Sequence, residues 1–495
     1  RGVADKAGGK ERASVTFIND GMKDISLWWD PPVGDGKYDG GKQLHVGTLG
    51  PEETRRFDTF IGHTFHVKGA CEHELTVRDS EELLRTCRHL LSKEERARRE
   101  INQVVNYAKM IPIKVLNGAN HPIFLWFCDR VATRNELIQE IASGEPAAST
   151  AYLEHTFAIT DVRDLDGCSA PLMSFNVSAG TYLHVFDDGS APPELSARIR
   201  AEETAAQDYL ARAGKHWVCH PKKQPPAKYM RPAEAIGDET VVSTCNPPLT
   251  TATPSHYNES EYLAMMRAPG PVLSAGCTDL TLRVISTSPR AFLIENFTSA
   301  AEADHLVGLG ASLISRSTTE SKVSRSRTSE NSWVERASSP VTERIFRRAA
   351  EVLGIDERFI WDKSGGAVRS ASGTSVDGSF PQGAESMQLV HYSVGQKYDA
   401  HYDWGVSHPE TRFATLLLYL KEPLEGGKTA FPKAETPTPL AVPPVAGSAV
   451  LFYNVLPDGN CDIDSLHAAM PVTEGEKWLA NIWVWDPMRS QEVSG

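Results

Sequence analysis

A histidine and an aspartate separated by one residue, His401-Tyr402-Asp403, are the strongest local signal for metal chemistry in this sequence. Residues i and i+2 of a β-strand point to the same face, so a strand here would direct both side chains at one metal ion. His467, on an expected later strand, is a candidate third ligand. Two histidines and one carboxylate on one face of an octahedron leave room for a bidentate co-substrate and O₂, which is typical of Fe(II) oxygenases.

Lys477 follows His467 by ten residues. A cation at this place is suited to the distal carboxylate of 2-oxoglutarate, whose keto-acid end would bind the iron. Each of these residues alone is weak evidence for a metal or co-substrate site, because an isolated His-x-Asp is common. Single His or Lys residues usually lie on the surface, or in the core with their hydrogen bonds satisfied. The interpretation therefore depends on the surrounding sequence.

The elements that must position these residues are helices followed by strands. Ser299 and Glu302 predict a capping box that opens an amphipathic helix to about Ile314, and Ser339-Pro340 predicts a second helix that stops at Gly354. Apolar patterns predict strands at 387–392, 414–420, 447–454 and 478–485. Helices first and antiparallel strands afterwards predict helices packed against a double-sheet barrel.

Long motifs in this region resemble prolyl 4-hydroxylases of the plant, algal and collagen type. They are ESMQLVHYSVGQKYDAHYD from Glu385, RFATLLLYL from Arg412, GGKTAFP from Gly426 and SLHAAMPVTEGEKWLANIW from Ser465. The resemblance covers about residues 280–489, including PRAFLIENF, which matches the start of the family's domain, and SRSRTS at 324–329, which matches its substrate-side loop. It implies a double-stranded β-helix (jelly-roll) with flanking helices.

Carried over by position, the resemblance implies roles for individual residues. The iron ligands would be His401, Asp403 and His467. Fe(II) would act with O₂ and 2-oxoglutarate as co-substrates and with ascorbate, and 2-oxoglutarate would be held by Lys477, Tyr392 and Thr415. The peptide groove would be lined by Glu385, Tyr398, Arg412 and Trp483. Aromatic walls suit the preformed polyproline II helix of a proline-rich peptide, although Tyr398 and Trp483 are also open to interpretation as barrel core.

Three departures from the family pattern concern the substrate rather than the iron. Trp485 stands where relatives often carry His, and Met470 stands where they frequently carry Cys, which leaves the pairing of Cys461 open. The connection between Asp403 and Arg412 is short, so we expect a reshaped substrate entrance.

An internal repeat with an offset of 98 residues organises the first half of the chain. VTFIN and ISLWW, from Val15 and Ile25, align with IKVLN and IFLWF, from Ile113 and Ile123, and each copy predicts a half-buried β-hairpin. Further aromatic strands are expected at 59–66 and 180–186, followed by charged helices at roughly 80–108 and 193–213. We therefore expect an α+β multidomain chain. Its divisions are a β-sandwich plus helix at 1–110, a related one at 111–215, a Pro- and Cys-containing linker at 216–279 and the catalytic domain at 280–495.

TLGPEETRRFDTFIGHTF, from Thr48, resembles the β-domain of the von Hippel–Lindau tumour suppressor, which recognises hydroxyproline in a peptide. The positions that fall at or near its pocket are Trp29, Thr59, His63 and Phe65, the last in place of a Trp, while Val46 falls near the place of a missing Tyr. The second copy lacks the Gly-His pair. Either the first copy binds hydroxyproline and tethers product-like chains, or both copies are scaffold or partner-binding sandwiches.

Composition bounds the location and the partners. A chain of 495 residues with 40% hydrophobic and 23% charged residues is ordinary for about three soluble domains. A net charge of −13 argues against non-specific nucleic-acid binding, and no apolar run approaches the roughly 20 residues of a membrane helix. Eight cysteines, sequons at Asn176, Asn258 and Asn296, and Arg1 in place of Met favour a removed leader and a secretory (endoplasmic reticulum or Golgi lumen) or secreted protein over a cytosolic one.

These observations predict peptidyl-proline 4-hydroxylation of Pro-rich secreted or cell-wall-type proteins, with 2-oxoglutarate converted to succinate. One alternative is an oxygenase for a single signalling or cytosolic protein, and the tumour-suppressor-like domain makes a protein partner for the N-terminal β domains conceivable. A second alternative is an inactive binding or assembly subunit. Retention of His401, Asp403, His467 and Lys477 together argues against that alternative.

Overall fold

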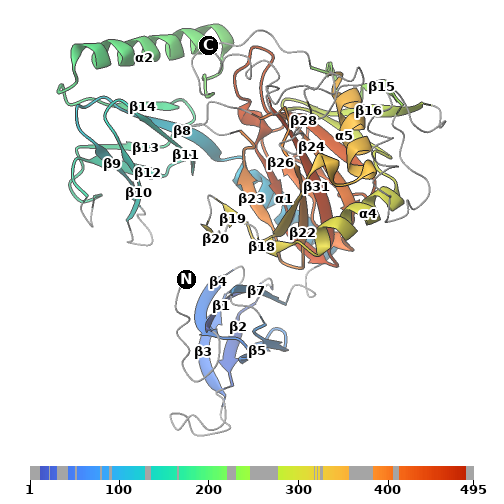
Figure 1. Ribbon diagram of the computed structural model, residues 1–495. Coiled ribbons are helices and arrows are strands. Elements are labelled where there is room, and N and C mark those ends of the chain that lie inside the picture. The colour runs from blue at the N-terminus through green and yellow to red at the C-terminus, as the bar shows by residue number, and fades with distance from the viewer. Residues whose placement is uncertain are drawn as a thin grey trace. The chain divides into compact units, whose positions relative to one another are not determined.

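The computed structural model describes residues 12–19, 21, 23–30, 43–50, 53–78, 81–87, 92–128, 135–163, 167–219, 230–245, 277–316, 318–319, 322–323, 327–355, 360, 383–404 and 412–485. The chain divides into two compact units, Arg1–Gln103 with Val394–Gln396, and Val104–Ser393 with Lys397–Gly495. The first unit contains one β-sandwich. The second contains another β-sandwich, a nine-stranded sheet and a smaller four-stranded sheet (Figure 1).

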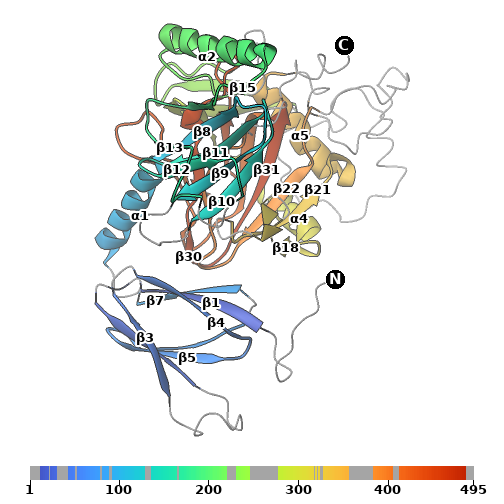
Figure 2. The same cartoon turned by 90° about the vertical axis from the view of Figure 1, so that its left-hand side faces the viewer.

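The first sandwich is built from two sheets, with strand orders β4-β1-β7 and β3-β2-β5-β6 (Figure 2). The strands are β1 (Arg12–Asn19), β2 (Ile25–Trp29), β3 (Leu44–Leu49), β4 (Thr54–Phe60), β5 (Thr64–Gly69), β6 (His73–Thr76) and β7 (Glu81–Thr86). Alternate residues of β1 and β2, among them Val15, Phe17 and Leu27, are buried in the core between the sheets. Helix α1 (Lys93–Tyr107) follows in the chain.

The second sandwich repeats this plan with sheets ordered β11-β8-β14 and β10-β9-β12-β13. Its strands are β8 (Met110–Asn117), β9 (Ile123–Cys128), β10 (Glu136–Ile141), β11 (Pro146–Tyr152), β12 (Thr156–Thr160), β13 (Met173–Asn176) and β14 (Leu183–Phe186). The last strand of each copy pairs in parallel with the first, as β7 with β1 and β14 with β8. Helix α2 (Pro193–Ala213) follows, with the bounds that the sequence predicted, and ends at Gly214 in a left-handed conformation.

Asn19 and Asn117 occupy the same corner of the two copies. Each side chain is buried, accepts a hydrogen bond from the backbone N–H two residues later and donates to the carbonyl four residues later. These bonds satisfy backbone groups where the chain leaves one sheet and enters the other. The 98-residue repeat is therefore present in the structure down to single hydrogen bonds.

The expected hairpins were wrong. β1 pairs with β4 and β7, whereas β2 pairs with β3 and β5, so the two strands of each expected hairpin lie in different sheets. The same holds for β8 and β9. Alternation of apolar residues shows which face of a strand is buried but not which strand lies beside it, and the buried asparagine turns the chain across the sandwich.

Two further boundaries in the first copy differ from expectation. The strand expected at 59–66 is interrupted at Gly62, whose φ of 85° suits a glycine in a turn, and becomes the end of β4 and the start of β5. The helix expected from about residue 80 begins only at Lys93, because Glu81–Thr86 forms β7. The counterpart of β14 is therefore β7, and not the segment at 59–66.

The remainder of the second unit is dominated by a nine-stranded sheet. In order across the sheet, its strands are β15 (Glu239–Thr244), β16 (Thr278–Thr287), β17 (Arg290–Ile294), β28 (Ala449–Tyr453), β24 (Arg412–Lys421), β31 (Lys477–Trp485), β22 (Met387–Tyr392), β21 (Glu330–Val334) and β18 (Ser315–Arg316). A four-stranded sheet contains β23 (Tyr398–His401), β29 (His467–Ala469), β26 (Thr429–Phe431) and β27 (Leu440–Val442). Two strand pairs complete it: β19 (Thr318–Thr319) with β20 (Lys322–Val323), and β25 (Glu425–Gly426) with β30 (Val472–Glu474).

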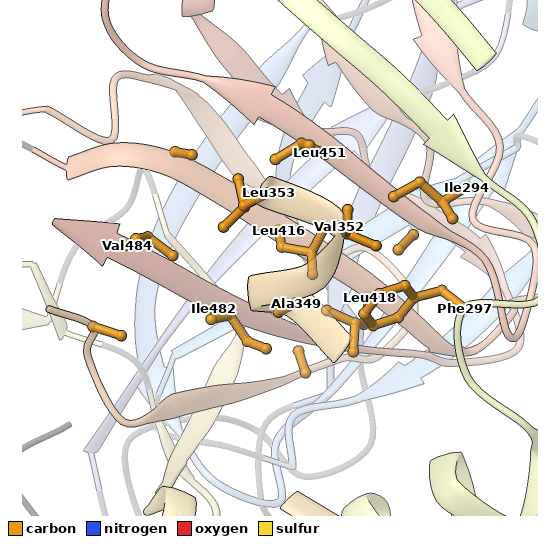
Figure 3. Close-up of a cluster of buried hydrophobic side chains, with 14 of the residues drawn as sticks. Ile294, Phe297, Ala349, Val352, Leu353, Leu416, Leu418, Leu451, Ile482 and Val484 are labelled. Carbon is orange, nitrogen blue, oxygen red and sulfur yellow. The ribbon is translucent and has the colours of Figure 1, made fainter. Parts of the chain in front are cut away.

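Two helices pack against the large sheet (Figure 1). Helix α4 (Ala300–Ala311) opens with the predicted capping box of Ser299 and Glu302, and α5 (Pro340–Leu353) opens at Ser339 and ends at Gly354, as predicted. Short 3₁₀ turns lie at η2 (Arg336–Ser338) and η4 (Ile463–Ser465). Figure 3 shows side chains of α5, including Ala349, Val352 and Leu353, among apolar side chains of the sheet. One buried apolar cluster therefore lies on this helix-covered face, and a second cluster, which includes Tyr419 and Phe452, lies on the other face of the same strands.

Part of the segment expected to be a linker belongs to the large sheet. β15 pairs with β16, because its alternating Val and Thr residues fit a half-buried edge strand. Residues 220–229 and 246–276, which include Asn258, lie outside the described residues. All eight cysteines form disulfides: Cys71–Cys87, Cys128–Cys168, Cys219–Cys461 and Cys245–Cys277. Within the described ranges, no helix is both long and apolar enough to cross a bilayer.

Candidate iron site

His401, Asp403 and His467 each bring a potential ligand atom to within 4.8 Å of the other two. His401 ends β23 and pairs directly with His467, the first residue of β29, while Asp403 lies two residues beyond the end of β23. Nε2 of His401 is 3.8 Å from Oδ1 of Asp403, and Nε2 of His467 is 3.6 Å from Oδ2. The sequence expectation that these three side chains meet is confirmed, although Asp403 belongs to the bend after the strand rather than to the strand itself.

Backbone carbonyls determine which ring nitrogen of each histidine faces the triad. Nδ1 of His401 lies 2.8 Å from the carbonyl oxygen of Asp399, and Nδ1 of His467 lies 3.0 Å from that of Ser465. A carbonyl only accepts hydrogen bonds, so each Nδ1 carries the proton and donates, which leaves the Nε2 lone pair for a metal. Burial, together with the neighbouring His467, lowers the pKa of His401 to about 3, so its imidazole is neutral at physiological pH.

Asp403 is held as a carboxylate by its surroundings. Burial alone would raise its pKa, but His467, Arg412 and His401, with a hydrogen bond from Thr415, outweigh this effect and lower the pKa to about 2. Two imidazole nitrogens and one carboxylate are the donor set that suits Fe(II). The three residues present therefore fit a divalent iron ion.

Lys477 is a fully buried cation beside two aromatic rings. Its Nζ donates to the carbonyl oxygen of Gly427 at 2.6 Å and lies 5.3 Å and 5.5 Å from the ring centroids of Tyr392 and Tyr419. Among the described residues, no carboxylate forms an ion pair with it. Burial lowers its pKa to about 7. A buried ammonium without a carboxylate partner fits an anionic ligand such as the distal carboxylate of 2-oxoglutarate.

The residues expected along the peptide groove gather around the triad. The guanidinium of Arg412 donates two hydrogen bonds to Glu385, at 2.6 and 2.9 Å, and lies 3.7 Å from the ring centroid of Trp483. Tyr398 stacks on His401 with ring centroids 3.6 Å apart. The structure thus brings these four side chains beside the iron ligands, and Trp483 additionally donates from Nε1 to Oδ2 of Asp403 at 2.9 Å.

Thr415 and Tyr392 differ in how they relate to the expected 2-oxoglutarate site. Tyr392 pairs with Lys477 across β22 and β31, and burial raises its pKa to about 12, so its hydroxyl remains protonated. Thr415 instead donates from its hydroxyl to Oδ2 of Asp403 at 2.7 Å. In this structure Thr415 therefore contacts an iron ligand, a role that the sequence did not suggest.

Sequence reasoning assigned no role to three further residues near the site. Tyr419 lies four residues after Thr415 on β24, so its place on the same strand face was available from period-2 alternation. Arg327, whose guanidinium lies 4.8 Å from the ring of Tyr398, falls within the SRSRTS motif. Asn454 had no sequence signal, because only the pairing of β24 with β28 brings it beside Thr415.

The four residues expected to form a hydroxyproline pocket in the first sandwich lie close to one another, and Trp29 pairs with Phe65 across β2 and β5. Thr59 Oγ1 lies 3.0 Å from Nδ1 of His63, whose ring centroid is 5.2 Å from that of Trp29. Phe65 lies in the sandwich core, 5.1 Å from the ring of Phe17. Thr59, His63 and Phe65 are all buried, so binding of hydroxyproline by this unit stays a prediction.

Comparisons with known proteins agree with the chemistry of the triad. Residues 387–485 match the family model described as the 2OG-Fe(II) oxygenase superfamily. The chain is 32% identical over 231 residues to probable prolyl 4-hydroxylase 4 of Arabidopsis thaliana. The matched region covers 41% of this chain and 70% of that protein. Prolyl 4-hydroxylase 2 of the same plant is 31% identical over 231 residues, 41% of this chain and 69% of that protein. A solved structure, viral collagen prolyl hydroxylase from Paramecium Bursaria Chlorella virus-1 with 2OG, is 27% identical, with a TM-score of 0.30 over 39% of this chain and 95% of that one.

Proposed function

We propose, since this chain belongs to the prolyl 4-hydroxylase family of Fe(II)- and 2-oxoglutarate-dependent dioxygenases, that its substrates are Pro-rich secreted or cell-wall-type proteins, which it hydroxylates at C4 of proline. The observation that carries the enzymatic part is the triad of His401, Asp403 and His467 together with the buried Lys477, which has no carboxylate partner in the part of the chain that the structure describes. Ascorbate is a cofactor typical of the family.

The roles of the residues follow from their protonation and contacts. Fe(II), when bound, supplies the O₂ chemistry coupled to oxidative decarboxylation of 2-oxoglutarate. His401 and His467 would hold it through Nε2, and Asp403 would supply the negative charge. Lys477 would bind the distal carboxylate of 2-oxoglutarate, with the rings of Tyr392 and Tyr419 excluding water from that contact.

A proline-rich segment would lie beside the triad. Tyr398 offers partly exposed aromatic surface, and the Arg412–Glu385 pair, which lies against the buried Trp483, offers hydrogen bonds to a peptide backbone. A polyproline II segment is already ordered before it binds, so such a surface captures it at a low entropic cost. We infer that the nine-stranded and four-stranded sheets are the two layers of a jelly-roll barrel, an inference supported by the pairing of His401 with His467 in the smaller sheet.

Four disulfides favour an oxidising compartment, because such bonds are rare in proteins of the cytosol. The sequon residues Asn176 and Asn296 are exposed, so both are accessible to glycosylation. We therefore assign the protein to the secretory pathway or the extracellular space. The same disulfides disfavour the alternative of an oxygenase for one cytosolic signalling protein.

The decisive experiment follows succinate release from 2-oxoglutarate with Fe(II) and a proline-rich peptide. Wild-type protein should release succinate in a peptide-dependent manner and add one oxygen atom to proline, while His401→Ala should do neither. His121→Ala, at an exposed histidine of the second sandwich, is the matched control and should retain activity. Iron binding without peptide-stimulated turnover would point to another substrate. Failure of the wild type to bind iron would leave an assembly subunit as the better interpretation.

For the first sandwich we propose a scaffold or partner-binding role rather than hydroxyproline recognition. The supporting observation is the burial of Thr59, His63 and Phe65, which leaves little of the expected pocket accessible. Paired proline and hydroxyproline peptides, titrated against the full chain and His63→Ala, decide the matter. A hydroxyproline preference that disappears in the variant would overturn the scaffold role.

A further inference from the structure

The two carboxylate oxygens of Asp403 have different surroundings. Oδ2 accepts hydrogen bonds from the Thr415 hydroxyl at 2.7 Å and from the Trp483 indole at 2.9 Å. Among the described residues no donor lies within hydrogen-bond distance of Oδ1, since the nearest Arg412 nitrogen is 3.7 Å away. Each carboxylate oxygen offers about two lone pairs, so both on Oδ2 are engaged while those on Oδ1 remain available.

The direction of the Thr415 hydroxyl depends on Asn454. Thr415 has one proton, and the carboxylate of Asp403 can only accept, so that proton is donated to Asp403. The hydroxyl oxygen must therefore accept its second hydrogen bond, and Nδ2 of Asn454 supplies it at 2.9 Å. The order of donation runs from Asn454 to Thr415 to Asp403, and the opposite orientation of the amide would break it.

An asparagine is an unusual residue at the position of Asn454 if its side chain serves only to fill space in the core. Its side chain is fully buried, and its Oδ1 has no hydrogen-bond partner among the described residues. A buried polar atom without a partner disfavours the folded state, whereas an apolar side chain of similar size would not. Its backbone bonds to Phe413 and Asp462 hold the residue in place between β24 and the segment that leads to His467. The amide donor is thus the feature of Asn454 that the structure uses.

We propose that Asn454 is a positioning residue for the iron site: acting through Thr415, and together with the Trp483 indole, it keeps Oδ2 of Asp403 engaged, so that Oδ1 is the single oxygen offered to Fe(II). This inference rests on the iron site proposed above. A carboxylate free to rotate would offer both oxygens and so compete for a coordination position that the co-substrates need.

The test uses the full chain and two readouts besides turnover: Fe(II) affinity and the visible absorption of the anaerobic Fe(II)–2-oxoglutarate complex. Asn454→Asp replaces the donor with an acceptor of the same shape and draws the Thr415 proton away from Asp403. Thr415→Val removes the hydroxyl, while Thr415→Ser restores it as the conservative rescue. Asn117→Ala is the matched control, because Asn117 is equally buried but bonds to His121 and Ile141 in the second sandwich instead of the triad.

Asn454→Asp and Thr415→Val should shift the visible absorption and weaken Fe(II) or 2-oxoglutarate binding by about 10–100-fold. Both variants should also release more succinate than the hydroxyproline they form. Thr415→Ser and Asn117→Ala should keep the wild-type spectrum, even where Asn117→Ala melts at a lower temperature. Wild-type spectra and affinities in Asn454→Asp would overturn the positioning role while leaving the proposed function intact. Absence of iron binding in the wild type would overturn both.

Discussion

Lys477 is buried, and none of the described carboxylates pairs with it, so its protonation can respond to a ligand. Burial lowers its pKa to about 7, whereas the ordinary value in an unfolded chain is about 10.4. Between these values the unfolded chain holds a proton that the folded one lacks, so burial of this residue destabilises the folded state progressively less as pH rises toward about 10. An anion bound at Nζ favours the ammonium form and therefore raises the pKa again.

We predict that 2-oxoglutarate affinity falls as pH rises above about 7, by up to about tenfold per pH unit, because binding must then take up a proton. The measurement is the dissociation constant of 2-oxoglutarate with the anaerobic, Mn(II)-loaded protein across neutral and mildly alkaline pH. Lys477→Arg retains its charge over this range and should abolish the dependence. A constant affinity in the wild type would contradict a 2-oxoglutarate contact at Lys477.

At the scale of elements, two helices and the large sheet are joined through buried charges as well as apolar contacts. Arg348 of α5 donates to Glu302 of α4 at 2.8 and 3.0 Å and to the carbonyl oxygen of Phe297, and both charged side chains are fully buried. The carboxylate of Glu302 also closes the capping box of α4. One ion pair therefore fixes both the start of α4 and its packing on α5.

Arg348→Met should destabilise the protein by about 3–5 kcal/mol, because it leaves the Glu302 carboxylate buried without a cation. Adding Glu302→Leu should recover much of this loss, since no unpaired charge then remains. Unfolding in urea, followed by tryptophan fluorescence, measures the change in the free energy of unfolding. Arg283→Ala is the comparison: its pair with Glu239 is about half exposed, so the loss should stay below about 1 kcal/mol. Equal losses in the two single variants would contradict this account.

At the scale of the whole molecule, the segment after α2 is fastened to the loop that delivers the third iron ligand. Cys219 forms a disulfide with Cys461, six residues before His467, and Asn460 accepts a hydrogen bond from the backbone of Val218. The disulfide joins residues separated by 242 positions in the sequence. We therefore expect loss of this disulfide to loosen the segment that leads to His467.

Replacing Cys219 and Cys461 by Ser should lower the melting temperature, because such a bond contributes about 2–5 kcal/mol to stability. It should also weaken Fe(II) binding, because the loop that carries His467 becomes looser. Cys128→Ser with Cys168→Ser, in the second sandwich, should lower the melting temperature but leave Fe(II) affinity unchanged. Calorimetry and metal titration separate the two effects. Unchanged iron affinity after loss of Cys219–Cys461 would show that the disulfide serves stability alone.

The sequence by itself determined the features that depend on neighbouring residues. Capping residues marked α4 and α5 because a cap satisfies backbone groups within one turn. Long motifs around His401, Asp403, His467 and Lys477 resemble the prolyl 4-hydroxylase family, and this resemblance identified the oxygenase. The 98-residue repeat was also legible, because both copies keep the same alternation of apolar residues.

Only the tertiary structure decided which distant residues meet. Apolar alternation reveals a strand's buried face but not its partner, so the expected hairpins became strands of opposite sheets. The pairing of eight cysteines could not be deduced from spacing. Asn454 became visible as a neighbour of Thr415 only once β24 and β28 were paired, because hydrogen-bond direction is a property of three-dimensional contact and leaves no periodic trace in a sequence.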